Sequence, residues 1–112
     1  MTKNVKEILK ELQTDINKMK TDIPDILNPF VDIIHGVHKD GAISTKFKEL
    51  ICMTISVHTH CDACIAAHTK NAREAGATYE EIMEACACAI LMGGGPSISS
   101  ISLVLRTLEA FS

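Results

Sequence analysis

The chain has no tryptophan, one tyrosine and three phenylalanines among its 112 residues. Apolar residues nevertheless make up 46% of it. A buried core must therefore be built from aliphatic, alanine and methionine side chains. A chain of this length can bury a core large enough to fold without disulfide bonds or a structural metal. We expect a single helical domain over residues 1–112.

An excess of basic residues is also missing, because the formal net charge is -3. This argues against a nucleic-acid binder, which would carry a clustered basic patch. The longest apolar stretch, around residues 85–92, is far too short to span a bilayer. The chain opens on a polar, helix-periodic stretch rather than on a signal peptide. We expect a cytoplasmic protein with neither a nucleic-acid nor a membrane partner.

The five cysteines are an odd number, and their spacing does not resemble the disulfide framework of a small secreted protein. In a reducing cytoplasm, a close cysteine pair is more often catalytic or metal-binding than structural. Cys52, Cys86 and Cys88 lie in apolar segments and are expected to be small core residues. Cys61 and Cys64 are therefore the candidates for a catalytic or metal-binding pair.

Helical periodicity runs through the whole chain, and no segment alternates as a strand would. An all-α fold of about six short helices is therefore predicted. The first is an amphipathic helix within residues 1–22, where apolar residues recur at steps of three and four. Pro24 begins the second, in which Pro29 predicts a kink or an early break and which should end near Gly41. Ser44 is the expected N-cap of a third helix that runs towards His58.

The second half of the chain carries clear helix boundaries. A fourth helix is expected from about Cys61 to Gly76, a typical C-terminal stop. Thr78 and Glu81 have the spacing of a capping box at the start of the fifth. A turn at residues 93–95 separates it from a sixth that begins at Pro96. This GGGP stretch follows a helix and lacks the Lys-Ser/Thr partner of a phosphate-binding loop, so it is interpreted as a turn.

The third and fifth helices are apolar on nearly every side. A helix of this kind must be buried on every side. Six short helices do not supply enough protein to surround two of them. We therefore predict an obligate homo-oligomer.

Cys61, Cys64 and His68 lie at positions i, i+3 and i+7 of the predicted fourth helix and share one narrow stripe. Cys61 lies at the start of that helix, where free N–H groups and the helix dipole favour a thiolate, the reactive form of cysteine. His68 follows Cys64 by one turn and can take or return a proton, directly or through one water. The arrangement predicts a redox pair with its base.

Glu49 is the candidate for a fourth member of the site. If the third and fourth helices form an antiparallel hairpin that turns near residues 58–59, Glu49 stands level with His68. The carboxylate would then orient the imidazole and stabilise its protonated form, as the third member of a triad does. The alternative is a solvated glutamate in the first turn of its helix.

Zinc is the main competing interpretation of the pair. Cys61, Cys64 and His68 could supply three ligands, and His58 or His60 the fourth. A second cysteine pair, however, is missing, and zinc clips usually lie on turns or knuckles. His58 and His60 could also line a redox site. The two remaining histidines, at positions 35 and 38, are expected at the surface or in a turn.

The spacing Glu49, eleven residues, Cys61-x-x-Cys64, three residues, His68 resembles the carboxymuconolactone decarboxylase-like, alkyl hydroperoxidase D-like superfamily. The resemblance covers residues 40–96, from DGAISTKFKELI through EAGATYEEIMEA to LMGGGPS. It implies an all-helical bundle that assembles as trimers or hexamers. The chain looks like the short, single-domain branch of this superfamily.

Members with this motif are thiol-dependent peroxidases with peroxiredoxin activity. The resemblance implies that Cys64 is oxidised by a small hydroperoxide and that Cys61 resolves the product to a disulfide. Glu49 and His68 would relay the proton, and an external dithiol would return the electrons. No cofactor and no metal is implied. The helix dipole alone instead favours Cys61 as the more activated thiol, so the order of attack stays open here.

The chain departs from the alkyl hydroperoxidase D pattern immediately before the second cysteine. Those proteins carry a histidine there, whereas this chain has Ala63 preceded by Asp62. The decarboxylases that give the superfamily its name lack the cysteine pair. A decarboxylase of that type is therefore the alternative enzyme, and a zinc-binding helical module is the alternative outside catalysis.

Overall fold

The computed structural model describes residues 4–112. Within them it contains six α-helices and no strand, which confirms the all-α prediction. The helices are α1 (Val5–Asp22), α2 (Pro24–His38), α3 (Thr45–Thr59), α4 (Asp62–Glu74), α5 (Tyr79–Gly93) and α6 (Gly95–Ala110).

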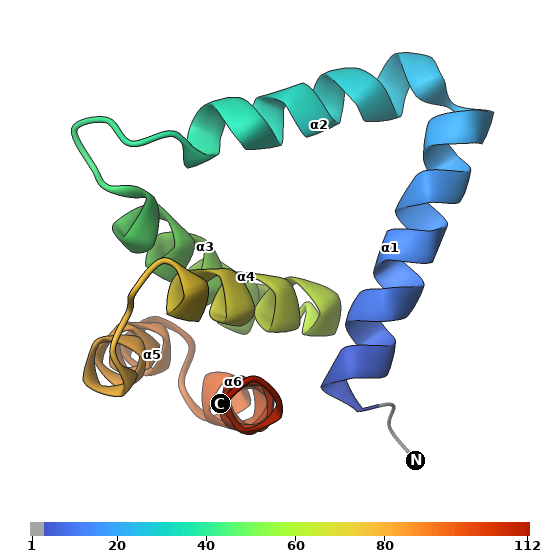
Figure 1. Cartoon of the computed structure of the whole chain (residues 1–112). Coiled ribbons are helices and arrows are strands. Elements are labelled where there is room, and N and C mark those ends of the chain that lie inside the picture. Colours follow the sequence, from blue (N-terminus) through green and yellow to red (C-terminus); the bar gives the residue numbers. More distant parts are fainter. Residues whose placement is uncertain (1–3) are drawn as a thin grey trace.

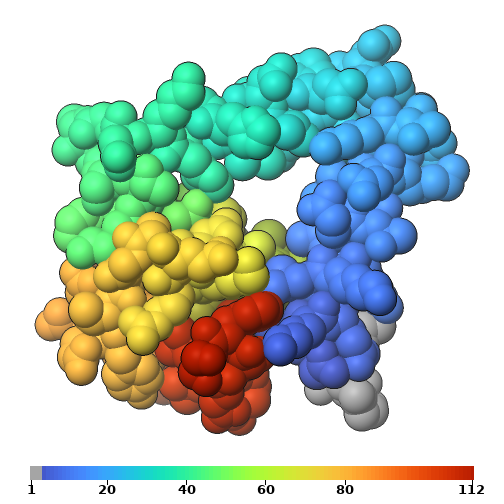
Figure 2. Space-filling view, viewed as in Figure 1, coloured from blue at the N-terminus to red at the C-terminus, as the bar shows by residue number. Residues whose placement is uncertain are grey.

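Helices α3 to α6 pack together, whereas α1 and α2 form an arm that frames one side of this bundle (Figure 1). The N-terminal end of α1 lies against α4 and α6. Helix α2 runs from the other end of α1 back towards α3. No residue of α2 is buried. In the space-filling view an opening separates α2 from the body of the molecule (Figure 2).

The sequence contains the caps that fix these helix ends. Ser44 accepts the N–H of Phe47, and Thr78 forms the predicted capping box with Glu81. Gly94 joins α5 to α6 at φ 66° and ψ -145°, a conformation that suits glycine, which confirms that GGGP is a turn. α6 begins at Gly95, one residue before the predicted start.

Helix α2 differs from its prediction in two ways. It runs without a break through Pro29, and it ends at His38 rather than near Gly41. Pro29 is only the sixth residue of the helix, so its missing N–H costs a single bond near the N-terminal end. Lys39 takes an extended backbone (φ -66°, ψ 145°), which ends the helix before the glycine.

The core is aliphatic, as the shortage of aromatic residues predicts. Its largest fully buried side chains include Met53, Ile65, Ile82 and Val104, which come from α3, α4, α5 and α6. Burying a side chain of this size contributes about 1.5–3 kcal/mol to folding. The core therefore holds the α3–α4 hairpin rigidly, and that hairpin carries the candidate site.

The chain exposes more surface than a compact monomer of its mass. Its accessible surface is 7043 Å², against about 6,100 Å² expected for a folded monomer of 12.2 kDa. Much of the arm's exposed surface is apolar. The side chains of α2 that are more than one-third exposed include Ile26, Phe30, Ile33, Ile34 and Val37.

Candidate active site

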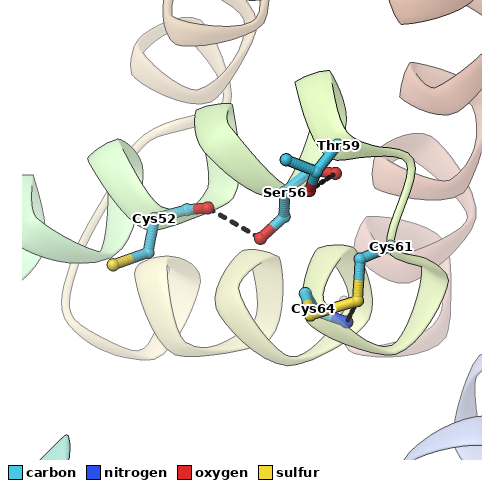
Figure 3. Close-up of a disulfide and its surroundings, with 5 residues drawn as sticks. All are labelled: Cys52, Ser56, Thr59, Cys61 and Cys64. Atoms are coloured by element: carbon cyan, nitrogen blue, oxygen red, sulfur yellow. Dashed lines mark hydrogen bonds between the residues drawn. A yellow bond between two sulfur atoms is a disulfide. The ribbon is translucent and has the colours of Figure 1, made fainter.

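The two cysteines lie where α3 turns into α4. His60 ends α3 in the left-handed region (φ 57°), and its N–H bonds back to the carbonyls of Ser56 and Val57. Cys61 is then the N-cap of α4, and its Sγ accepts the N–H of Cys64 at 3.4 Å. The two sulfurs are joined in a disulfide (Figure 3), with 5.2 Å between the Cα atoms. The turn therefore places the pair at the positive end of a helix.

Glu49 and His68 face each other across the same hairpin. Glu49 Oε1 lies 2.7 Å from Nδ1 of His68. The predicted contact between α3 and α4 is therefore present, and the alternative of a solvated glutamate is wrong, because Glu49 is only 2% exposed. An ionised carboxylate only accepts hydrogen bonds, so the neutral His68 tautomer that fits this contact is the one with its proton on Nδ1 and a lone pair on Nε2.

A third side chain, His38, joins this pair, and its expected place at the surface or in a turn is wrong. Its Nε2 lies 2.9 Å from Oε2 of Glu49, so two imidazoles share one buried carboxylate. The rings of His38 and His68 meet edge to face, with centroids 6.3 Å apart. The histidine is the last residue of α2, and a connection of only six residues (39–44) joins it to the start of α3. That short connection is the one feature of the sequence that indicates the contact.

The turn after His38 is tied to the start of α3. The Thr45 hydroxyl donates to the carbonyl of His38 at 2.6 Å, and the Thr45 N–H donates to Oδ1 of Asp40 at 2.7 Å. Lys48 Nζ donates to the carbonyl of Lys39 at 2.5 Å. The Thr45 hydroxyl also lies 2.9 Å from Oδ1 of Asp40. The N–H and the hydroxyl of Thr45 together lower the pKa of the Asp40 carboxyl, and the N–H contributes most. These bonds hold the end of α2, and with it His38, over Glu49.

The remaining cysteines differ from one another. Cys86 is a core residue as predicted, and burial raises the pKa of its thiol to about 11. Cys88 is exposed, which corrects the prediction that it lies in the core. Residues two positions apart on an α-helix are separated by about 200° around the helix axis, so Cys88 points away from Cys86. Cys52 is half-buried, and burial followed by the charge of Glu49 raises its pKa.

The two histidines of the α3–α4 turn do not complete the site. His60 shares a hydrogen bond of 2.7 Å with the hydroxyl of Ser100 on α6, which fixes the turn against the bundle. His58 is exposed at the last turn of α3. Neither forms a bond to Glu49 or His68 within the residues that the structure describes.

A groove lies away from the Glu49 carboxylate. It encloses about 1000 Å³ between α1 and α6, and Asp62 is its closest lining residue in sequence to the cysteines. Its other lining residues lie in residues 4–10 and 99–110. His38, Glu49 and His68 are not among the residues that line it.

The chain resembles known proteins both in sequence and in fold. A model of the Carboxymuconolactone decarboxylase family matches residues 24–107, three-quarters of the chain. The chain belongs to the carboxymuconolactone decarboxylase family. The matched range contains α2 to α5 and nearly all of α6, and with them every side chain of the site.

Relatives of similar length occur in several bacteria. An uncharacterised protein of Cupriavidus necator is 30% identical over 100% of this chain and 99% of its own length. A crystal structure of a family member from Legionella pneumophila has a TM-score of 0.92 at 34% identity and covers 96% of both chains. A Thermotoga maritima member, for which a role in the antioxidative response is suggested, has a TM-score of 0.83 at 27% identity; 92% of this chain and 88% of that one are covered.

No helix among residues 4–112 combines the length and the apolar character that a membrane span requires.

Proposed function

We propose that this carboxymuconolactone decarboxylase family protein is a thiol-dependent peroxidase that reduces small hydroperoxides through Cys61 and Cys64. The observation that carries the proposal is the Glu49–His68 bond of 2.7 Å, because it supplies an oriented base one turn after Cys64. The disulfide between the cysteines supports the second half of the cycle, since this fold places the two sulfurs close enough to bond. The antioxidative role suggested for the Thermotoga maritima relative points the same way.

The reaction begins when Nε2 of His68 accepts the thiol proton of Cys64, while the Glu49 carboxylate stabilises the imidazolium through Nδ1. The thiolate attacks one peroxide oxygen and the O–O bond breaks. His68 then protonates the departing alkoxide to an alcohol, and Cys64 is left as a sulfenic acid. The sulfur of Cys61 gives up its thiol proton and attacks the sulfenic sulfur, the disulfide forms, and the departing hydroxide takes that proton and leaves as water. An external dithiol supplies two electrons and two protons to restore both thiols.

The order of attack follows from position relative to the base. Cys64 lies one turn before His68, whereas Cys61 is the N-cap and already accepts the N–H of Cys64. The N-cap position favours an anionic sulfur, which suits a thiolate that resolves a sulfenic acid. Cys64 is therefore assigned the first attack and Cys61 the resolution.

Single serine variants of the reduced protein test this assignment. With one equivalent of cumene hydroperoxide and dimedone present, Cys61→Ser should carry the dimedone adduct on Cys64, located by peptide mass mapping. Cys64→Ser should carry none. An adduct on Cys61 in the Cys64→Ser protein, with none on Cys64 in the other, would reverse the order. No adduct in either variant would contradict the peroxidase proposal.

We also propose that the protein works as a homo-oligomer in which a second copy covers the arm. The accessible surface exceeds that of a compact monomer by about 1,000 Å², and a stable interface buries about 800 Å² per partner. The exposed apolar side chains of α2 supply such a surface next to the opening in Figure 2. Light scattering should give a multiple of 12.2 kDa, and Phe30→Asp should release monomers. A monomeric wild-type protein would contradict the proposal.

A further inference from the structure

The carboxylate of Glu49 has one more imidazole than a proton relay needs. His68 alone suffices to exchange a proton with the thiol, yet Nε2 of His38 lies 2.9 Å from the other carboxylate oxygen. The three side chains come from three helices, α2, α3 and α4. The Glu49 side chain is 3% exposed, and the two histidine side chains are 26% and 25% exposed. A buried acid therefore faces two accessible nitrogen ligands.

The positions of these atoms allow a common ligand. One donor atom from each of His38, Glu49 and His68 lies within 4.8 Å of the other two. For three atoms so spaced, a single point lies within about 2.8 Å of all of them, and zinc–ligand distances to histidine and carboxylate are about 2.0–2.2 Å. Side-chain movements of less than about 1 Å would close the difference, which is within the range of ordinary χ adjustments.

The chemistry of the set fits a divalent transition-metal ion. Two histidines and one glutamate form a ligand set that zinc uses in enzymes, with the remaining position left for water. Imidazole nitrogen also suits the other late first-row ions. The charge of Glu49 offsets part of the ion's charge in a buried place, and the partly exposed rings provide a way in. The bonds from Thr45 and Lys48 hold the backbone beside His38 in place.

We propose that His38, Glu49 and His68 bind one divalent transition-metal ion, and that the bound ion inhibits the thiol reaction. The inhibition rests on the proposed function, whereas the binding does not. His68 meets Glu49 through Nδ1. A metal on that nitrogen moves the ring proton to Nε2, which can then no longer accept the thiol proton. Metal binding and proton relay therefore exclude each other at the same side chains.

Zinc binding is measured first in a tag-free protein without the redox pair, Cys61→Ser/Cys64→Ser. Serine is itself a good N-cap, so α4 should keep its start. Calorimetry should give about one Zn²⁺ per chain. Adding His38→Ala should weaken binding by at least about tenfold. His35→Ala, an exposed histidine one turn earlier on α2, is the matched control and should leave the affinity unchanged.

Two results would overturn the site. Loss of zinc binding in the double-serine protein would place the ion on Cys61 and Cys64, as a cysteine-based clip requires. Unchanged affinity in the His38→Ala protein would show that the cluster does not hold the ion. Circular dichroism of each variant establishes that a loss of binding is not a loss of fold. Cobalt gives a second readout, because a site without sulfur shows no thiolate-to-metal charge-transfer band.

The inhibition is tested separately, on the reduced wild-type protein and on His38→Ala. Saturating Zn²⁺ should slow thiol oxidation by hydroperoxide at least tenfold more in the wild type than in the variant. Equal inhibition of both would overturn the inhibitory role, since the ion would then act through the cysteines. A protein that binds zinc through His38 but never reacts with hydroperoxide would contradict the proposed function and leave the metal site standing.

Discussion

Replacing Glu49 with glutamine keeps the size of the side chain and removes the buried charge that faces His68. During the reaction the imidazole becomes positively charged with Glu49 Oε1 2.7 Å from Nδ1. The His68 side chain is one-quarter exposed, so the effective dielectric constant lies between that of the protein interior and that of bulk water. With a value of about 40, the attraction is about 3 kcal/mol, or roughly a hundredfold in rate. Glu49→Gln should therefore oxidise about a hundredfold more slowly.

The effect on stability should be much smaller than the effect on rate. Each of the two bonds to imidazole loses its charge-assisted part, about 1 kcal/mol. The amide in turn avoids the cost of burying a carboxylate, which acts in the opposite direction. The melting temperature should therefore move by less than about 8 °C. Stopped-flow measurement of thiol loss after mixing with cumene hydroperoxide gives the rate, and calorimetry gives the melting temperature.

The comparison contains its own control. A variant that melts within this range but reacts a hundredfold more slowly isolates the electrostatic role of Glu49. A Glu49→Gln protein that reacts within twofold of the wild type would refute the relay. A variant that unfolds outright would show that the carboxylate is mainly structural, and the estimate of opposing terms would be wrong.

Three smaller predictions follow from the rest of the chain. At pH 8 iodoacetamide should modify exposed Cys88 in the folded protein and leave Cys86 intact, because burial raises the pKa of the Cys86 thiol to about 11; equal labelling, read by mass spectrometry, would contradict this. Thr78→Ala removes the capping box and should cost about 1 kcal/mol in thermal or urea unfolding, whereas no loss would mean that the cap is dispensable. The lowered pKa of Asp40 stabilises the fold above the unfolded value of 3.8, and this contribution is lost as the pH falls through the folded value. The Asp40→Asn variant should therefore melt below the wild type at pH 6, and the gap should narrow as the pH falls below 3.8 and close once it is below the folded value; a gap that does not narrow as the pH falls through this range would refute the assignment.

The sequence predicted the helices well where it contained specific end signals. The capping box at Thr78 and the turn at Gly94 are local features, so they survive whatever the rest of the chain does. The contact between Glu49 and His68 was also within reach, because a tight hairpin pairs positions equidistant from its turn. Local chemistry and simple helix geometry were enough in each case.

The sequence did not predict which face of α3 is buried. The apolar side chains of Phe47 and Ile51 are exposed, while the polar side chains of Glu49 and Ser56 are buried. Polar groups can be buried when they have partners, and here Glu49 has two imidazoles and Ser56 donates to the carbonyl of Cys52. Hydrophobicity alone cannot anticipate those partners.

His38 was missed for a related reason. Its place depends on how the arm folds back over the hairpin, and the turn that fixes it is held by hydrogen bonds from Thr45 and Lys48. Helical periodicity shows which face of a helix is apolar but not how two helices are oriented relative to each other. The lone histidine at the end of an exposed helix therefore looked like a surface residue until α2 and α3 were placed together.

The most direct test of the account is the stoichiometry of one turnover. Fully reduced, chelator-treated protein is mixed with one equivalent of cumene hydroperoxide, and the peroxide, the alcohol, the free thiols and the disulfide are each quantified over time. The account predicts that each mole of hydroperoxide consumed yields one mole of alcohol and one Cys61–Cys64 disulfide, with loss of two thiols. Two results would contradict the peroxidase assignment. The hydroperoxide could persist while both thiols stay reduced, or it could be consumed no faster than by a small control thiol.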